Sequence, residues 1–205
     1  NALPTETISG SCARAAKINK NGLPDLFVGG MFTPGSFPVA PESFILKNKS
    51  TAGKIRFEKD SVTHDASIKK MGMVTDAVWT DINKDGWEDL IVVGQFMPVR
   101  IFENHQGKLK DATGTYGLAN TNGWWRRILA DDFDNDGDTD FVIGNLGLNS
   151  SFKATPEEPL SITYGDFFSI HKCTLAQAGA EEFIANGIKR GADNDFKALA
   201  LAMEQ

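Results

Sequence analysis

The fold is decided by the stretch Asp132-Phe133-Asp134-Asn135-Asp136-Gly137-Asp138-Thr139-Asp140, which has an upstream counterpart, Asp81-Ile82-Asn83-Lys84-Asp85-Gly86-Trp87-Glu88-Asp89. Both copies have oxygen-bearing side chains at positions 1, 3, 5 and 9 and a glycine at position 6. Alternate residues of a tight loop can direct several oxygens at one centre, and Ca²⁺ takes about six to eight oxygen ligands. Glycine provides the backbone freedom that such a turn requires. The repeated spacing therefore predicts two loops that bind a hard cation.

The downstream loop is strongly acidic, because residues 131–140 contain six aspartates and no basic residue. Carboxylates about 4 Å apart repel one another by about 1 kcal/mol per pair even in the dielectric of bulk water. A solvated acidic turn is the simpler alternative, since Asp, Asn and Gly favour turns without any metal. Two copies in the same register favour the cation, which converts the repelling charges into ligands.

The sequence after each loop distinguishes between calcium motifs. An EF-hand has a carboxylate at position 12 of its loop and a helix after it. Position 12 is Val92 in one copy and Ile143 in the other, and both lie in short apolar runs rich in β-branched residues. Such runs are typical of strands. The loops therefore end their ligand set at position 9 and lead into strands, which argues against an EF-hand and against a dockerin, the helical duplicated calcium module.

A third, weaker copy lies upstream over residues 17–25, where Asn19, Asn21, Gly22 and Asp25 occupy positions 3, 5, 6 and 9. Position 1 is Lys17, so a positive charge replaces a ligand. We predict that this loop binds no metal. We also expect the Lys17 ammonium to substitute in part for the cation by bridging the loop's oxygens.

The three loops mark a repeat whose units begin at residues 17, 81 and 132. Each unit reads as a loop, a strand, a connection and further short strands with an Asn-led turn. Repeats of this length with several short strands are typical of β-propeller blades, which have about four strands each. The predicted fold class is therefore all-β.

These residues resemble a known family. The two acidic loops, the segment DLIVVG at 89–94 and the segment IFEN at 101–104 resemble the FG-GAP/VCBS repeats of integrin-type β-propellers. Residues 72–104 and 117–150 resemble bacterial VCBS-repeat proteins related to the cartilage acidic protein and ASPIC/UnbV group. The resemblance covers roughly residues 10–165. It implies an extracellular, cell-surface or periplasmic β-propeller with structural calcium, and it implies no catalytic residues.

The resemblance also implies which residues hold the two calcium ions. Side chains at positions 1, 3, 5 and 9 are ligands, and the residue at position 7 gives its backbone carbonyl. The implied ligands are Asp81, Asn83, Asp85, Trp87 and Asp89 in one loop, and Asp132, Asp134, Asp136, Asp138 and Asp140 in the other.

The chain is expected to have two parts. Residues 1–165 form a propeller segment of about three units, and residues 166–205 form a divergent tail, expected to be helical because it is rich in good helix formers. Three units form only a partial propeller, because a closed ring needs about four to eight blades. Open blade edges invite self-association. The two cysteines, Cys12 and Cys173, either pair or remain free thiols.

Composition excludes several function classes. The net charge of −6 and the pI near 5.1 argue against a nucleic-acid partner. The sequence has no apolar run close to the ~20 residues of a membrane-spanning helix. His64, His105 and His171 have no metal-ligand spacing, and no nucleophile motif is present. Adjacent strand residues face opposite ways, so one indole of the pair Trp124-Trp125 is expected in the core and the other at the surface, where it could stack on a sugar or anchor a protein partner. Core packing of the pair is the simpler alternative.

The leading interpretation is a non-enzymatic, calcium-stabilised β-propeller segment for extracellular recognition or adhesion of a protein or carbohydrate ligand. Calcium at the millimolar concentrations found outside cells fills weak oxygen-rich sites, whereas resting cytosol leaves them empty. The alternative is an accessory propeller domain of a larger carbohydrate-active enzyme. The proposed role in adhesion rests on analogy between folds alone.

Overall fold

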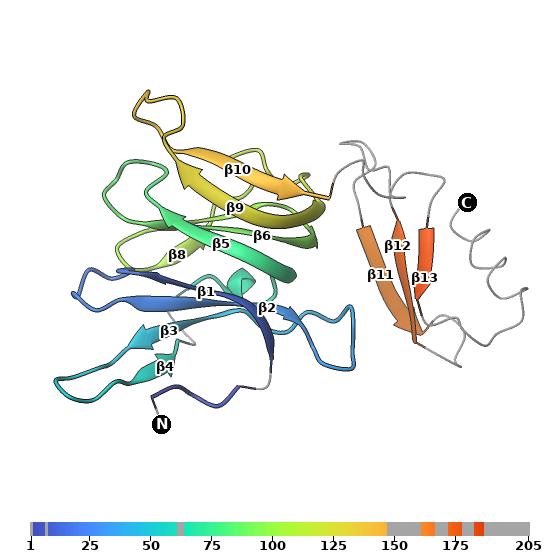
Figure 1. Ribbon diagram of the computed structural model, residues 1–205, viewed down its shortest axis with the longest axis horizontal. Coiled ribbons are helices and arrows are strands. Elements are labelled where there is room, and N and C mark those ends of the chain that lie inside the picture. Colours follow the sequence, from blue (N-terminus) through green and yellow to red (C-terminus); the bar gives the residue numbers. More distant parts are fainter. Residues whose placement is uncertain are drawn as a thin grey trace, which may run out of the picture.

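A computed structural model describes residues 2–6, 8–60, 64–146, 161–166, 172–177 and 183–186. Its regular structure is almost entirely antiparallel β-sheet, with a single 3₁₀ turn in the described ranges (Figure 1). The all-β prediction is therefore confirmed. The elements are β1 (Ser9–Ala16), β2 (Asp25–Phe32), β3 (Phe44–Asn48), β4 (Phe57–Lys59), η1 (Ala66–Ile68), β5 (Met73–Thr80), β6 (Asp89–Met97), β7 (Arg100–Asn104), β8 (Leu109–Asp111), β9 (Gly123–Asp131), β10 (Asp140–Asn145), β11 (Ser161–Asp166), β12 (Lys172–Gln177) and β13 (Phe183–Asn186).

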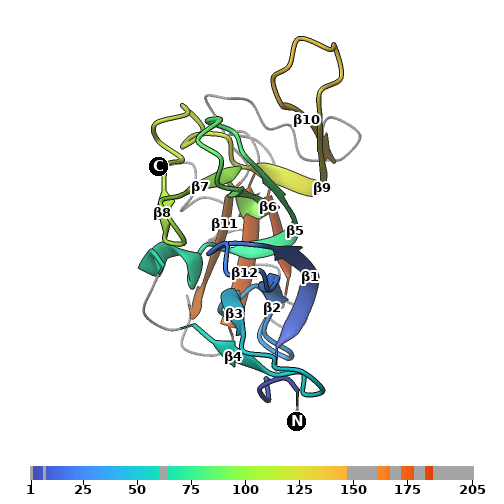
Figure 2. The same ribbon diagram turned by 90° about the vertical axis from the view of Figure 1, so that its left-hand side faces the viewer.

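The first ten strands form propeller-like blades. Strands β1 to β4 pair in order as the first blade, and β5 to β8 pair in order as the second. Strands β9 and β10 form the described part of the third blade, which also pairs with β6 at Gln95 and Trp124. Strand β1 contacts β5, and β5 contacts β9, so the first strands of the three blades follow one another along one side (Figure 2).

The repeat extends to an irregularity in the backbone. In each blade one extra residue interrupts the pairing of the first two strands, six residues before the loop begins: Ser11, Thr75 and Arg126. The Ser11 hydroxyl donates to the Gly29 carbonyl at 3.3 Å, and the Thr75 hydroxyl donates to the Val93 carbonyl at 3.2 Å. A β-bulge at one position of every unit is a structural feature in its own right. The three units therefore correspond residue by residue at this edge.

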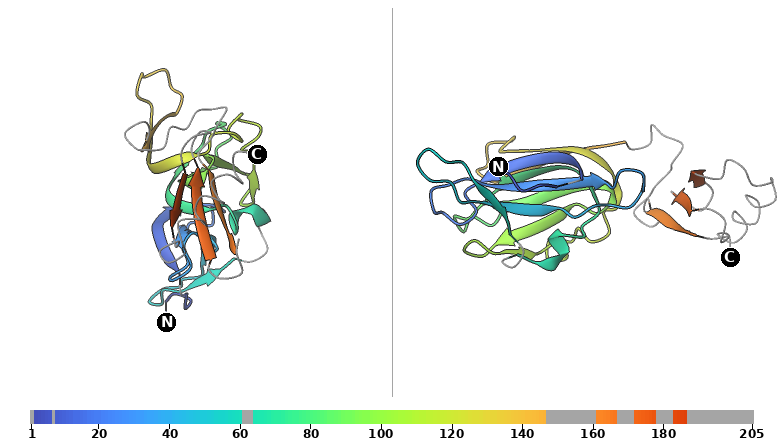
Figure 3. Two further views of the ribbon diagram at one scale, coloured as in Figure 1. Left: turned by 90° about the vertical axis from the view of Figure 1, so that its right-hand side faces the viewer. Right: turned by 90° about the horizontal axis from the view of Figure 1, so that it is seen from below.

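Two apolar clusters lie between the blades. Strand β6 is buried along nearly its whole length because neighbouring blades cover both of its faces, and in Figure 1 it lies between β1 to β4 below and β9 and β10 above. Seen from below in Figure 3, the blades overlie one another. Leu90 and Val92 belong to the cluster shared with the first blade, and Ile91 and Val93 belong to the cluster shared with the third. Alternate side chains of a strand point to opposite faces, which explains this division. The uninterrupted apolar run of β6 thus reflects burial on two sides.

The expected helical tail is wrong where the structure describes it. Residues 172–177 form β12, which pairs with β11 and with β13. Helix propensity is a weak preference that strand pairing overrides, and these segments include Thr, Phe and Ile, which suit strands. The other tail residues lie outside the described ranges, and the division at residue 165 stays a prediction. The Cys12 thiol is free.

Candidate metal loops

The three nine-residue loops share one backbone conformation. Each joins the first two strands of its blade, and all three lie on the left of Figure 1. The residue at position 4 and the glycine at position 6 have positive φ in every loop. The φ values are 54° at Lys20, 57° at Lys84 and 61° at Asn135, and 89° at Gly22, 86° at Gly86 and 86° at Gly137. Glycine adopts such angles without strain, which explains its place at position 6.

In the 81–89 loop, oxygen side chains turn inward and accept backbone hydrogen bonds. The two Asp81 carboxylate oxygens accept from the N–H groups of Asp85 at 3.0 Å and Gly86 at 2.7 Å. The Asn83 side-chain oxygen also accepts from Asp85 N–H, at 3.0 Å. The Asp85 carboxylate accepts from Trp87 N–H at 2.8 Å. The side chains at positions 1, 3 and 5 are therefore held by the loop's own backbone.

The 132–140 loop repeats this network. Asp132 accepts from the N–H groups of Asp136 at 3.1 Å and Gly137 at 3.0 Å. Asp134 accepts from Asp136 N–H at 3.1 Å, and Asp136 accepts from Asp138 N–H at 2.8 Å. One carboxylate oxygen from each of Asp132, Asp134 and Asp136 lies within 4.8 Å of the others. The structure thus brings together three of the predicted ligands, with carboxylate lone pairs left over after the backbone bonds.

Position 9 connects each loop to its blade. The Asp89 side chain is fully buried, and its carboxylate accepts from Asn104 N–H at 2.7 Å and from Ile82 N–H at 3.1 Å. Burial raises the pKa of Asp89, while these two hydrogen bonds oppose the shift. Asp140 accepts the equivalent bond from Phe133 N–H at 3.0 Å. The predicted position-9 ligands therefore also anchor the loop backbone.

Sequence reasoning missed the part that Asn104 plays. Its buried side-chain amide donates to the Glu88 carbonyl and to the Ile18 carbonyl, both at 3.0 Å. One asparagine therefore joins the loop of its own blade to the loop of the first blade. The signal was the Asn that ends the corresponding strand of the first unit, Asn48, whose amide donates to the Pro24 carbonyl at 2.9 Å.

The first loop is closed differently from the expectation. The Asn19 amide donates to the Asp25 carboxylate at 3.0 Å, so positions 3 and 9 of this loop are joined directly. Lys17 instead uses its backbone N–H, which donates to Glu88 at 3.2 Å, and its ammonium has no ion pair within the part of the chain that the structure describes. The bridging role of Lys17 is therefore wrong, because a neutral amide already within the loop fills it. The metal-free state of this loop stays a prediction.

Adjacent loops also contact one another. The Lys20 ammonium lies 4.0 Å from the centre of the Trp87 ring, and the Lys84 ammonium forms an ion pair with the Asp138 carboxylate. The hydroxyls of Thr80 and Thr139 are 3.3 Å apart. These contacts could not be read from the spacing of any single loop.

Part of the chain that contains both acidic loops is similar to a known repeat family. Residues 81–143 match the family model described as FG-GAP-like repeat. Residues 81–143, which are similar to that family, are called the FG-GAP-like segment below. The FG-GAP-like segment begins on the first residue of one acidic loop, runs through strands β6 to β8 of the second blade and ends in β10, three residues beyond the other acidic loop. No curated protein matches the chain. Among the described residues, the structure contains no helix long and apolar enough to cross a membrane.

The tryptophan pair does not divide as expected. Both Trp124 and Trp125 are half-buried. Trp125 packs against the cluster between the second and third blades, and its ring N–H donates to the Thr121 carbonyl at 2.9 Å. Trp124 lies against Phe96, with ring centroids 5.2 Å apart. Each indole has an apolar neighbour, so neither is left as a free surface anchor.

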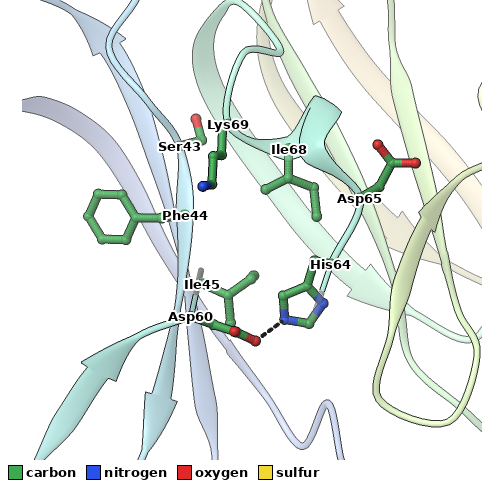
Figure 4. Close-up of a pocket in the computed structure, with 8 residues that line it drawn as sticks. All are labelled: Ser43, Phe44, Ile45, Asp60, His64, Asp65, Ile68 and Lys69. Atoms are coloured by element: carbon green, nitrogen blue, oxygen red, sulfur yellow. Dashed lines mark ion pairs between the residues drawn. The ribbon is translucent and has the colours of Figure 1, made fainter. Parts of the chain in front are cut away.

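A small pocket between the first two blades contains a buried histidine (Figure 4). The His64 Nδ1 accepts from Leu109 N–H at 3.2 Å, so the neutral ring carries its proton on Nε2, which lies 3.0 Å from the Asp60 carboxylate. Asp60 also pairs with Lys47 at 2.8 Å. His64 therefore connects the segment after β4 to β8 of the next blade. The lining residues are Ser43, Phe44, Ile45, Asp60, His64, Asp65, Ile68 and Lys69.

Acidification is expected to weaken the fold through His64. Burial lowers the pKa of His64, with Asp60 opposing the shift. Below about pH 6.5 the unfolded chain binds a proton that the folded chain does not. The free energy of unfolding should then fall by up to about 1.4 kcal/mol per pH unit, until the pH reaches the folded-state pKa.

Urea unfolding between about pH 7.5 and pH 5.5, with chelator present, measures this effect. His64→Gln should flatten the dependence in that range, because glutamine does not titrate. Equal slopes for the two chains would rule out His64 as the cause.

Proposed function

We propose that the loops 81–89 and 132–140 each bind one Ca²⁺ and that the segment is a calcium-stabilised propeller piece for extracellular recognition. The observation that carries the proposal is the shared hydrogen-bond network, which holds the oxygen side chains at positions 1, 3 and 5 in both loops. The FG-GAP-like match begins on the first of these loops and includes all of the second. Recognition by propeller-type domains is the general role that this match supports.

The proposed role of calcium is structural. The backbone N–H groups orient the carboxylates before any cation arrives, so binding has little ordering to do. The cation then removes the repulsion among the carboxylates of one loop, which is strongest in the 132–140 loop with its five aspartates. The backbone carbonyls of Trp87 and Asp138 complete the proposed sets. No catalytic step is assigned to the described residues.

The proposed setting is extracellular, cell-surface or periplasmic, because loops built from exposed oxygens suit millimolar calcium. The proposed partner is a protein or a carbohydrate bound by the complete propeller. A relationship to the cartilage acidic protein and ASPIC/UnbV group belongs to the same proposal, and it is supported by the resemblance of residues 72–104 and 117–150.

Asp136→Ala is expected to lower the bound calcium from two ions per chain to one. Asp136 supplies the position-5 carboxylate, and alanine offers no ligand. Asn21→Ala is the matched control, because Asn21 occupies position 5 of the first loop and accepts from Leu23 N–H at 2.9 Å in the same way. Calcium counted at saturation should stay at two ions in the control. Two ions bound by Asp136→Ala would show that the ligand assignment is wrong.

A further inference from the structure

The contact between neighbouring loops follows one rule at both blade boundaries. The lysine at position 4 of one loop reaches the side chain at position 7 of the next loop. Lys20 lies over Trp87 at the first boundary, and Lys84 pairs with Asp138 at the second. At the first boundary the lysine meets an aromatic face, and at the second it meets an acidic loop.

The Lys84 ammonium interacts with three aspartates of the 132–140 loop, namely Asp132, Asp136 and Asp138. Its hydrogen bond and charge interaction with Asp138 raise the pKa of Lys84, and the charges of Asp136 and Asp132 add to the shift. Asp132 and Asp136 belong to the carboxylate group with converging oxygens. The loop itself contains five aspartates and no base. The ammonium that pairs with this loop therefore comes from the neighbouring blade.

We propose that Lys84 is the resident counter-ion of the 132–140 loop and that it sets the calcium affinity of this loop from the neighbouring blade. The inference rests on the proposed calcium binding. Without a divalent cation, the ammonium offsets part of the carboxylate repulsion. With Ca²⁺ among Asp132, Asp134 and Asp136, the same ammonium is repelled, so its presence weakens binding.

The expected size of the effect follows from Coulomb's law. Charges of +1 and +2 roughly 8 Å apart in water interact by an energy worth about a fourfold change in affinity at 10 mM salt, and nearly nothing at 1 M salt. Lys84→Gln should therefore tighten calcium binding at this loop by about fourfold at low ionic strength. The gain should disappear at high ionic strength.

A purely mechanical role for Lys84 makes a different prediction. If the ion pair only held the two loops together, removing either partner would weaken calcium binding. As a counter-ion, Lys84 gives the two substitutions opposite signs. Asp138→Asn removes a negative charge and leaves the ammonium facing the loop, so it should weaken binding, although the backbone carbonyl at position 138 is unchanged.

The experiment is a calcium titration of the full chain at about 10 mM and about 1 M salt, comparing the unsubstituted protein with Lys84→Gln, Asp138→Asn and the double variant. Lys54→Gln is the charge-matched control, because Lys54 is exposed in the turn between β3 and β4 and belongs to none of the three loops. Repeating Lys84→Gln in an Asp136→Ala background separates the two loops, because Lys84 is also position 4 of the 81–89 loop. Any gain that remains in this background belongs to the 81–89 loop, and the gain assigned to the 132–140 loop is the part that disappears.

Tighter binding for Lys84→Gln, weaker binding for Asp138→Asn and loss of both effects in high salt would support the inference. Unchanged or weaker binding for Lys84→Gln at low salt would overturn it while leaving the calcium role intact. An equal gain from Lys54→Gln would also overturn it, because the effect would then be one of overall charge. So would a gain that persists in full in the Asp136→Ala background, because the effect would then belong to the 81–89 loop. Absence of any calcium binding by the unsubstituted chain would overturn the proposed function, and this inference with it.

Discussion

Asp89→Ala is expected to remove one bound calcium ion and to lower the free energy of unfolding by about 2 kcal/mol, even in chelator. The Asp89 carboxylate is fully buried and accepts from Asn104 N–H at 2.7 Å. Alanine leaves that buried N–H without its acceptor, and an unsatisfied buried donor retains its full desolvation cost. The same substitution takes away the position-9 oxygen of the proposed calcium set.

Asp25→Ala separates the two effects. Asp25 is 1% exposed and accepts from Asn48 N–H at 2.7 Å, so it anchors the first loop as Asp89 anchors the second. Asp25→Ala should lower the free energy of unfolding in chelator by a similar amount. At saturating calcium the variant should still bind two calcium ions. Urea unfolding in chelator and calcium counted at saturation measure the two quantities. A full calcium count in Asp89→Ala would contradict the assignment of Asp89 as a ligand.

Gly94→Ala is expected to destabilise the second blade by about 3 kcal/mol, because the new methyl group has no room. A Cβ at Gly94 would overlap the Met73 carbonyl oxygen and lie 2.5 Å from the Met97 sulfur. The carbonyl belongs to the paired backbone of β5, which can move only by disturbing the strand pairing between β5 and β6.

Gly114→Ala is the matched control, since no atom lies within 4 Å of a Cβ at that position. Its free energy of unfolding should stay within about 0.5 kcal/mol of the original value. Equal stability of Gly94→Ala and the unsubstituted chain would show that β5 and β6 do not approach as closely as described. Urea unfolding in chelator compares the three chains.

The sequence predicts the loops well because their information is local. Positions 1, 3, 5, 6 and 9 are few residues apart, and the apolar runs after them predict β6 and β10 directly. The repeat of this unit predicts blades, and the blades are found. The alternation of Leu90 and Ile91 into two different clusters follows from the pleat of a strand buried on both faces.

The contacts between units could not be predicted from local spacing. The bond from Asn104 to the Ile18 carbonyl joins residues 86 apart, and the ion pair between Lys84 and Asp138 joins residues 54 apart. Both depend on how blades pack. The helix prediction for residues 172–177 is wrong because pairing with β11 overrides the local helix propensity of this segment.

The most direct test of the calcium account is a thermal melt of the full chain with calcium titrated against chelator and the bound calcium counted at saturation. Binding only to the folded state contributes about 2.7 kcal/mol per site when calcium exceeds Kd a hundredfold. The account predicts two calcium ions per chain and a large rise in Tm. No bound calcium and an unchanged Tm would contradict it, and both acidic loops would then be solvated turns.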